Sequence, residues 1–533
     1  MKSSLLAGAA LSLGLSGIGC VRTSNKFDTI IKNGVVYNGE GGKPFSGEIG
    51  IKDGKITAIS TSLGESADQI VDAQGRAISP GFIDIHTHTD ENLFDAPLGD
   101  SRIYQGITTD IGGNCGYGPF PSTKWNSITE FYEALTKANI GINYNSFIGQ
   151  GEVRHLVVGD NDERCTPEQL AQMKKIVAEQ MERGAVGISC GLEYTPGSYA
   201  TNEEIAELCK EVARYNGLFA IHMRNEDDYV EESIAEAIHI ARTAGVRLEI
   251  SHLKAQNEAN WHKGPDMLRL IEKAEADGVD IAFDRYPYTA FSTGMSSFIP
   301  LSERQGSNAE IVARLKSPTT SKKIGEYAES RMKRLGGPKN VVVTSCEREH
   351  NKQYVGLNVE ECAKMAGKEP WPFVRDLLID EDISVSIIGF AMTEENASMF
   401  LSHRLGMPAS DGSVYSPIGV LSESMPHPRS YGTMPRFLGK YCRDESLMDL
   451  ATAIKKCTSL PASRIGLKER GILQPGLYAD IVIFDPVTII DAATYADPHQ
   501  YATGISDVFV NGIWTLHDGK PTGKVGGGIL KHG

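Results

Sequence analysis

Short apolar segments that alternate with polar residues occur at both ends of the chain. Between residues 29 and 60 they are separated by Asn33-Gly34 and Asp53-Gly54, and the same texture returns at residues 479–484 and 508–514. Asn-Gly and Asp-Gly between alternating apolar residues are strong signals for tight β-hairpins. The pattern therefore predicts one small β-sheet domain assembled from the two ends of the chain.

Between these ends, short apolar segments alternate with helical patterns. Residues 166–183, 202–215 and 231–244 have helical periodicity, and each is followed by an apolar run typical of a buried strand. Repeated strand-helix units of about 30 residues predict an α/β fold with a parallel sheet. Because the region is long and no glycine-rich phosphate fingerprint opens its helices, a closed (β/α)8 TIM-type barrel fits better than an open, doubly wound sheet.

The predicted organisation has two domains and one insertion. Residues 26–80 and 470–533 form a composite β-sandwich domain, residues 81–469 form the barrel, and a break in the rhythm around residues 292–335 indicates an insertion between barrel units. Barrel enzymes carry their sites where the carboxyl ends of the strands meet. Polar side chains that follow apolar strands are therefore the candidates for chemistry.

The first 20 residues have the layout of a secretory signal. Lys2 precedes an apolar run from Leu5 to Ile18, and the segment ends in Gly19-Cys20. This run is too short to span a membrane as a mature helix. The ending resembles a bacterial lipoprotein box, in which the cysteine becomes lipidated; the alternative is cleavage near Gly19 with Cys20 as an ordinary residue. We predict export to the periplasm or, through a lipidated Cys20, attachment to the cell envelope.

The charge balance argues against a nucleic-acid partner. The 533 residues contain 53 Lys and Arg against 68 Asp and Glu, for a formal net charge of -15, and no basic block stands out. A nucleic-acid-binding surface needs clustered positive charge. The 9 cysteines are scattered without a Cys-x-x-Cys pair. We therefore predict free thiols rather than a disulfide framework.

Histidines follow three of the predicted barrel strands. His86 and His88 end the first apolar strand two residues apart, so both imidazoles point to the same side. His222 and His252 each follow a later apolar run, about one strand-helix unit apart. Each histidine alone is more often a core or capping residue, but four at equivalent strand ends predict a metal site.

Cys115 and Asp411 are further candidates whose roles the residue pattern leaves open. Cys115 lies among small residues, where a thiolate would suit zinc, but a free cysteine is more often an inert apolar residue. Asp411 precedes Gly412, and Asp-Gly is usually a turn. If these side chains converge with the histidines, the group could hold one or two zinc ions and use an activated water against a stable amide. The residues alone thus indicate a metal-dependent hydrolase.

Seven short motifs narrow this interpretation. They are residues 81–88, 113–116, 191–194, 251–254, 284–288, 410–412 and 427–429. On these motifs the chain resembles the D-aminoacylases, also called N-acyl-D-amino-acid deacylases, of the metal-dependent amidohydrolase superfamily. The His-x-His pair alone would indicate only an amidohydrolase. The cysteine motif together with His-Pro-Arg indicates a much smaller group of families.

The resemblance implies a zinc enzyme that hydrolyses N-acyl-D-amino acids to a carboxylate and a free D-amino acid. It implies one tightly bound Zn2+, a weaker second site, and a single residue that acts as general base and general acid. The tight site would be formed by Cys115, His222 and His252, the weaker site by His86 and His88, and the base would be Asp411.

The resemblance also implies how the substrate is held. Lys254, Tyr286 and Arg429 are expected to bind its free α-carboxylate, because an ammonium, a phenol and a guanidinium can together hold a carboxylate. Gln150, between Gly149 and Gly151, departs from the family pattern, in which a histidine often lies between small residues. Gln150 could donate a hydrogen bond to the substrate carbonyl but not a proton. The expected partner is a small molecule.

Other functions stay open at this point. The same chemistry could act on dipeptides with a C-terminal D-residue or on cyclic amides, although the implied carboxylate site favours acyclic substrates. A non-catalytic exported binding protein would keep the barrel without needing the complete ligand set or Asp411.

Overall fold

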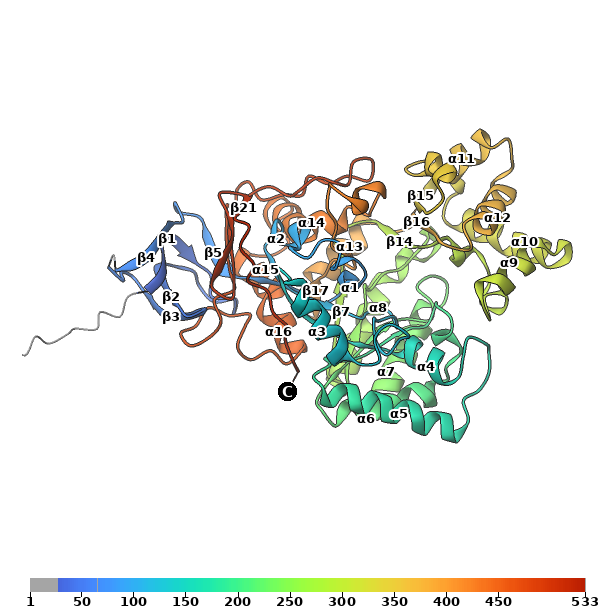
Figure 1. The fold of residues 1–533 in the computed structure, drawn as a ribbon, viewed down its shortest axis with the longest axis horizontal. Helices are drawn as coiled ribbons and strands as arrows, with labels where there is room; N and C mark the ends of the chain where they lie inside the picture. Colours follow the sequence, from blue (N-terminus) through green and yellow to red (C-terminus); the bar gives the residue numbers. More distant parts are fainter. Residues whose placement is uncertain (1–26, 65, 533) are drawn as a thin grey trace, which may run out of the picture.

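The computed structural model describes residues 27–64 and 66–532 and has a mixed α/β architecture. Figure 1 shows a mixed β-sheet at one end of the molecule, a central body of parallel strands with surrounding helices, and a lobe of helices and short strands at the other end. The predicted signal segment and Cys20 lie outside the described residues. Within the described part of the chain, no helix is long and apolar enough to cross a membrane.

The sheet at one end contains strands from both ends of the chain. It has nine strands in the order β21-β20-β19-β18-β5-β1-β2-β3, with β4 paired to β1. The antiparallel pairing of β5 with β18, through Ile481 and Pro80, joins the N-terminal and C-terminal parts. The strands are β1 Phe27–Val36, β2 Phe45–Lys52, β3 Lys55–Ser60, β4 Ala67–Asp72, β5 Ala77–Pro80, β18 Ile481–Phe484, β19 Ile505–Val510, β20 Ile513–His517 and β21 Lys520–Pro521.

The last residues of the chain do not lie in this sheet. The sequence predicted a sheet domain that extends to residue 533, and the observed domain ends earlier. The Leu530 amide donates to the Tyr144 carbonyl oxygen at 2.8 Å, and the His532 amide donates to the Gly184 carbonyl oxygen at 3.0 Å, so the tail lies along the central body. A Cβ at Gly527 would lie 2.3 Å from the Ile142 carbonyl oxygen. The close backbone approach therefore depends on glycine, which the composition of the tail alone does not reveal.

Parallel strands form the central body. Their order is β6-β7-β8 in one sheet and β9-β10-β11-β12-β13-β17 in the next, and only Phe147 separates β8 from β9. A parallel bridge between Thr87 and Gly412 connects the segments that follow β6 and β17. The strands are β6 Phe82–Asp84, β7 Ile107–Gly112, β8 Asn143–Ser146, β9 Ile148–Gly149, β10 Gly187–Gly191, β11 Leu218–His222, β12 Arg247–Ile250, β13 Ile281–Arg285 and β17 Gly406–Pro408.

Helices that connect these strands pack their apolar faces on the parallel strands. The predicted helices correspond to α5, α6 and α7, and α5 begins with a capping box between Thr166 and Gln169. The other helices either continue this outer layer or lie between the parallel strands and the nine-stranded sheet. The main helices outside the lobe are α1 Thr89–Asn92, α2 Asp100–Ile103, α3 Ile128–Ala138, α4 Gln150–Val157, α5 Pro167–Glu182, α6 Asn202–Ala213, α7 Val230–Ala244, α8 Gly264–Ala276, α13 Glu394–Ser402, α14 Arg429–Arg436, α15 Leu450–Cys457 and α16 Ser459–Arg464.

The lobe lies between β13 and β17 and has its own sheet and core. It begins near the predicted residue 292 but extends to residue 390 rather than 335, because β14 and β15 both pair with β16 in an antiparallel sheet. Apolar side chains of this segment form a separate buried cluster. We call residues 290–390 the insertion. Its elements are β14 Ala290–Gly294, α9 Asn308–Lys316, α10 Pro318–Arg334, β15 Val341–Cys346, α11 Val359–Met365, α12 Pro370–Asp380 and β16 Val385–Phe390.

Candidate metal centre and substrate cavity

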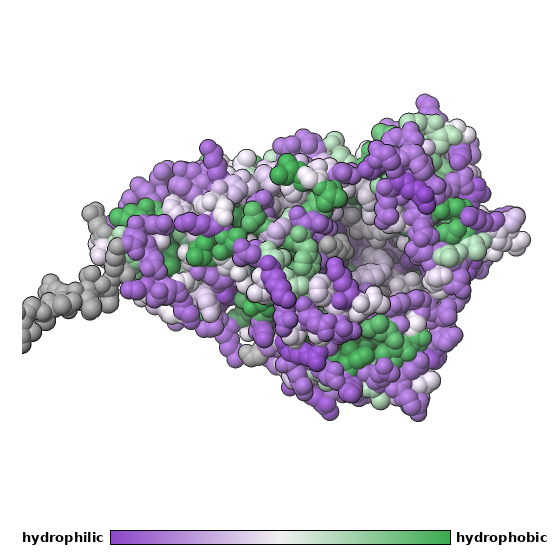
Figure 2. All heavy atoms as spheres, in the orientation of Figure 1, coloured by the Kyte–Doolittle hydropathy of each residue, from purple (hydrophilic) through white to green (hydrophobic). Residues whose placement is uncertain are grey.

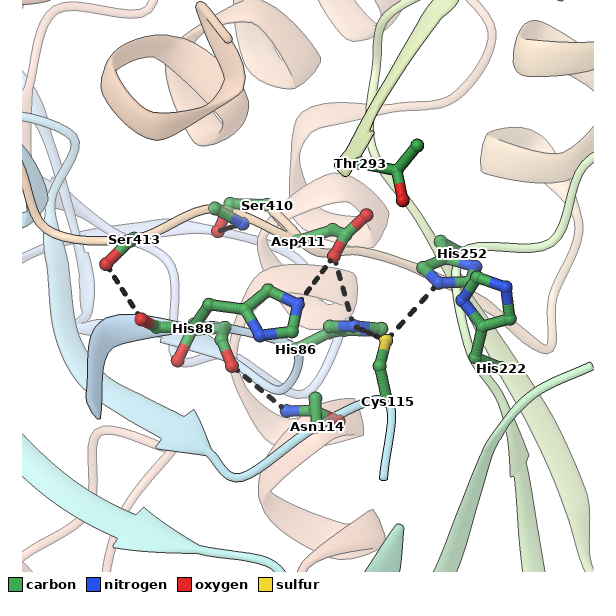
Figure 3. Close-up of polar contacts among 12 residues, drawn as sticks. His86, His88, Asn114, Cys115, His222, His252, Thr293, Ser410, Asp411 and Ser413 are labelled. Carbon is green, nitrogen blue, oxygen red and sulfur yellow. Dashed lines mark hydrogen bonds and ion pairs between the residues drawn. The ribbon is translucent and has the colours of Figure 1, made fainter. Parts of the chain in front are cut away.

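The predicted site residues converge where the parallel strands end. His86 and His88 follow β6, Cys115 follows β7, and Asp411 follows β17. His222 is the last residue of β11, and His252 comes two residues after β12. Figure 3 shows the side chains of these residues directed toward a common centre. The expectation that strand ends of a parallel sheet gather the chemistry agrees with this arrangement.

Cys115 lies at the middle of the cluster and has a basic environment. Its Sγ lies 3.4 Å from His86 Nε2 and 3.5 Å from His252 Nε2. Burial raises the pKa of the Cys115 thiol, but the adjacent His86 and His252 charges lower it more, so the pKa lies well below its usual value. The thiolate, which is the form that binds metals, is thereby favoured.

Asp411 contacts both histidines of the His-x-His pair. Its Oδ1 lies 3.3 Å from His86 Nε2 and 3.1 Å from His88 Nε2. Burial raises the pKa of the Asp411 carboxyl, but the Arg429 guanidinium and the neighbouring histidines lower it well below its usual value. Asp411 is thus a buried carboxylate that is held ionised.

Two carboxylates lie behind the histidines and fix their orientation. Asp284 Oδ2 lies 3.1 Å from His86 Nδ1, and Glu226 Oε1 lies 3.0 Å from His252 Nδ1. In each ring the other nitrogen, Nε2, therefore faces Cys115. Carboxylates in this position fix the tautomer of ligand histidines and increase their basicity. Neither Asp284 nor Glu226 was predicted from the sequence to have a role in the site.

His222 is buried next to two carboxylates, with Nε2 3.6 Å from Glu193 Oε2 and 3.9 Å from Glu226 Oε2. Neither ring nitrogen makes a hydrogen bond within the described part of the chain. Burial lowers its pKa, but the negative charges of Glu226, Glu193 and Cys115 raise the pKa of His222 to about 10. Leaving buried polar atoms unpaired costs free energy, so a site with such atoms is one that a metal or ligand can complete.

The donor atoms fit a metal such as zinc. One ligand atom from each of His86, Cys115, His252 and Asp411 lies within 4.8 Å of the others, and a second group of the same kind is formed by His222, Glu226 and His252. A thiolate among imidazoles and carboxylates is a donor set that suits zinc. His88 was predicted as a ligand but belongs to neither group.

The three residues expected to bind a carboxylate lie together. The Tyr286 side chain is completely buried, and its hydroxyl has no hydrogen-bond partner among the residues described. Lys254 Nζ and the Arg429 guanidinium lie 5.8 and 4.9 Å from the centre of its ring. Tyr288, the neighbour in the same motif, instead donates from its hydroxyl to Asp491 at 3.0 Å and so points away from the metal cluster.

The sequence leaves the role of Gln150 open, and the structure places this residue outside the cavity lining. It is completely buried at the start of α4, and neither its side-chain oxygen nor its nitrogen has a hydrogen-bond partner in residues 27–64 and 66–532. Gln150 is not among the residues that line the cavity over the metal cluster. A hydrogen bond from Gln150 to a substrate carbonyl therefore has no support in this structure.

A cavity of about 330 Å³ lies over the cluster, with the insertion as its opposite wall. From the insertion, Thr293 donates to or accepts from the Tyr194 hydroxyl at 3.2 Å, and Arg331 also reaches the lining. Figure 2 shows the molecule hollowed between the insertion and the helices α4 to α7. The cavity is thus bounded by residues that are far apart in the sequence.

Comparisons with known proteins agree with this geometry. An amidohydrolase family model matches residues 69–515. The chain is 31% identical over 524 residues to a D-aminoacylase of Alcaligenes xylosoxydans xylosoxydans, covering 95% of this chain and 98% of the relative. It is also 31% identical to an N-acyl-D-glutamate deacylase of the same organism, covering 94% of this chain and 96% of the relative.

Solved structures give the same assignment. A zinc- and phosphonate-inhibitor-bound N-acyl-D-glutamate deacylase from Bordetella bronchiseptica has a TM-score of 0.80 at 29% identity, covering 95% of this chain and 100% of that one. A D-aminoacylase structure has a TM-score of 0.80 at 31% identity with the same coverage. The chain therefore belongs to the amidohydrolase family and, within it, to the D-aminoacylases.

Proposed function

We propose that the protein is a zinc-dependent hydrolase of N-acyl-D-amino acids, which releases a carboxylate and a free D-amino acid. The observation that carries this proposal is the position of Asp411. It lies between the thiolate and histidine cluster on one side and the cationic Arg429 on the other, beneath a cavity of small-molecule size. The named activities of the relatives support the same reaction.

Cys115, His222 and His252 would hold the tightly bound zinc, and His86 and His88 would contribute to a weaker second site. Bound zinc supplies a Lewis acid and lowers the pKa of water. Asp284 and Glu226 fix the rings of His86 and His252 through Nδ1. This orientation leaves Nε2 of both rings for the metal.

Asp411 would carry the proton in both halves of the reaction. Its ionised carboxylate accepts a proton from the attacking water and then returns it to the amide nitrogen, so that the D-amino acid leaves as an amine. Arg429 donates from Nη1 to Asp411 Oδ2 at 2.7 Å, which keeps the carboxylate ionised before the reaction. Lys254, Tyr286 and Arg429 would hold the α-carboxylate and so select the face of the α-carbon.

We also propose that the parallel strands close into a (β/α)8 barrel with a composite β-sandwich beside it. The strand order, the short β8-β9 junction and the parallel bridge between Thr87 and Gly412 support closure. In such a barrel the candidate residues would share one rim, as the proposed reaction requires.

Export to the periplasm or the cell envelope remains part of the proposal and rests on the first 20 residues. Fractionation of cells that express the full chain tests it. Recovery in the periplasmic or membrane fraction is expected, and palmitate labelling that is lost in Cys20→Ser would identify a lipid anchor. Recovery of the intact chain in the cytosol would contradict export.

Hydrolysis of matched N-acetyl-D and N-acetyl-L amino acids by the zinc-loaded protein tests the activity. Cleavage confined to the D-series is expected. Cleavage of only dipeptides or cyclic amides, or of no amide despite bound zinc, would contradict the proposed function.

A further inference from the structure

The cavity contains three cationic side chains, and two of them are already paired. Lys254 Nζ lies 2.6 Å from Glu226 Oε1, and Arg429 Nη1 lies 2.7 Å from Asp411 Oδ2. The third, Arg331, also lines the cavity. Among the described residues, the buried Nε of Arg331 has no hydrogen-bond partner, although the Tyr327 side chain makes a hydrogen bond elsewhere on the guanidinium. A buried guanidinium nitrogen without a partner is costly unless a ligand satisfies it.

Arg331 comes from α10 of the insertion and is held toward the cavity by its neighbours. Arg334, one turn further along α10, lies 3.8 Å from Asp227, next to Glu226 in the segment that follows β11. The buried side chains of α10 include Ala328 and Met332, on either side of Arg331 in the sequence. The guanidinium is therefore positioned by packing of the helix and is not free in solvent.

Arg331 has acidic neighbours on two sides. Burial lowers the pKa of Arg331, but the charges of Glu193 and Asp227 and the Tyr327 side chain raise it more, so the guanidinium stays charged. The Glu193 carboxylate lies on the metal side of the cavity, with Oε2 3.6 Å from His222 Nε2. A second arginine, Arg304, donates from Nη1 to the main-chain carbonyl oxygen of Glu193 at 3.0 Å. Burial and the nearby positive charge of Arg331 both lower the pKa of Arg304.

The rest of this wall is polar. Besides Arg331 and Gly294, the insertion lines the cavity with hydroxyl groups and with one apolar side chain, the ring of Phe291. Figure 3 shows Thr293 on the opposite side of Asp411 and His252 from Cys115. Burial of an apolar side chain against hydroxyls and a guanidinium would leave these groups without partners. The hydroxyl-bearing residues of the wall are Ser292, Thr293, Ser296, Thr344, Ser345 and Ser386.

We infer that Arg331 binds a second carboxylate of the substrate, so that the preferred substrates are N-acyl-D-amino acids with two carboxylates. The inference rests on the proposed function and names its substrate class. The α-carboxylate would lie at Lys254, Tyr286 and Arg429, and the second carboxylate would lie at Arg331 and the hydroxyl wall. The second carboxylate belongs either to an acidic D-side chain or to a dicarboxylic acyl group, and both supply the same chemistry to Arg331.

The test compares kcat/KM of the zinc-loaded protein for four substrates. N-acetyl-D-glutamate and N-acetyl-D-glutamine differ only in the charge of the side chain, and N-succinyl-D-methionine and N-succinamoyl-D-methionine differ only in the charge of the acyl group. We expect kcat/KM for one dicarboxylate to exceed kcat/KM for its neutral partner by about 10- to 100-fold, which is the usual effect of a hydrogen bond to a charged group. The pair that shows the difference identifies the source of the carboxylate.

Variants connect the preference to Arg331. Arg331→Met is expected to reduce the ratio between the dicarboxylate and its neutral partner by about 10-fold or more, mainly through KM. Lys333→Met, an exposed position on the same helix, controls for the loss of a charge and is expected to keep the wild-type ratio. If Arg331→Met does not fold, Arg331→Lys, which keeps the charge but not the planar fork, is expected to lower the same ratio.

The outcomes separate the inference from the proposed function. The inference would be overturned if the wild-type protein cleaved both neutral substrates as well as or better than the dicarboxylates. It would also be overturned if folded Arg331 variants kept the wild-type ratio of kcat/KM between dicarboxylate and neutral partner. Either result would leave the deacylase function in place. Failure to cleave all four substrates with zinc bound would overturn both.

Discussion

Arg429 donates from Nη1 to Asp411 Oδ2 at 2.7 Å, and both side chains are almost completely buried. The expected carboxylate-binding residue is thus paired with the expected general base. A substrate α-carboxylate would be a second anion for the same guanidinium. Binding of substrate and ionisation of the base are therefore coupled through one side chain.

Replacement of Arg429 should change both substrate binding and pH dependence. In Arg429→Met, KM for N-acyl-D-amino acids is expected to rise by about 10- to 100-fold, because a charge-assisted hydrogen bond is lost. Arg429 lowers the pKa of Asp411, so its removal raises that pKa and moves the acidic limb of kcat/KM to higher pH. Measurement of kcat/KM across pH checks this. A variant with unchanged KM and an unshifted acidic limb would contradict the pairing as a functional contact.

Asp411→Asn should abolish proton transfer while the neighbouring contacts stay. The amide has the size of the carboxylate but does not accept a proton, so we expect kcat to fall by about 100- to 10,000-fold. Steady-state kinetics on an N-acetyl-D-amino acid, with zinc content measured in the same samples, check the prediction. Asp277→Asn, an exposed carboxylate at the end of α8, serves as the matched control, and its activity is expected to remain within a few-fold of wild type. Wild-type turnover by Asp411→Asn would exclude Asp411 as the base.

The sequence predicted the residues that directly follow strands better than those further along the loops. His222 could be found because an apolar run ends next to it, and parallel strands bring such positions to one edge. Asp411 lies in an Asp-Gly pair that usually marks a turn, so only the family resemblance assigned its role. Glu226 lies four residues beyond the end of β11, and only the path of the loop brings it to His252. Asp284, inside β13, had the same signal as the histidines but was assigned no role.

The insertion could be predicted only in part. The break near residue 292 was visible, but its end was not, because β15 and β16 have the same apolar texture as the parallel strands of the central body. Their antiparallel pairing with each other and with β14 is a long-range contact that periodicity does not contain. The position of Arg331 in the cavity depends on how α10 packs against the neighbouring helices of the insertion. The helical pattern alone therefore could not assign Arg331 to the site.

Glu226→Gln should weaken metal binding without a large change in volume. The amide cannot provide the negative charge that Glu226 places 3.0 Å from His252 Nδ1, and it leaves Lys254 without its partner. Loss of such a carboxylate behind a ligand histidine usually costs about 10- to 100-fold in metal affinity. Competition with a zinc chelator measures the affinity directly, and the exposed Glu232→Gln on α7 is the matched control. Equal zinc affinity in Glu226→Gln and wild type would show that Glu226 does not support the ligand.

Arg102 is expected to be essential for both stability and the position of the Asp411 loop. It is completely buried, lies 3.0 Å from Asp110 and 3.5 Å from Asp84, and donates to the Gly412 carbonyl oxygen at 2.8 Å. Arg102→Met leaves two buried carboxylates without their cation, so we expect the free energy of unfolding to fall by about 3–5 kcal/mol.

Because the same side chain holds the segment next to Asp411, we also expect folded Arg102→Met to lose kcat. Denaturant unfolding and steady-state kinetics on the same preparation measure the two effects. Arg183→Met, at an exposed position just after α5, should change stability by no more than about 0.5 kcal/mol. If Arg102→Met unfolds at the same denaturant concentration as Arg183→Met, the buried network does not carry the stability assigned to it. If Arg102→Met is destabilised but keeps full kcat, the position of Asp411 depends on other contacts, of which the hydrogen bond from the Asp411 amide to the His86 carbonyl oxygen at 2.8 Å is the next to test.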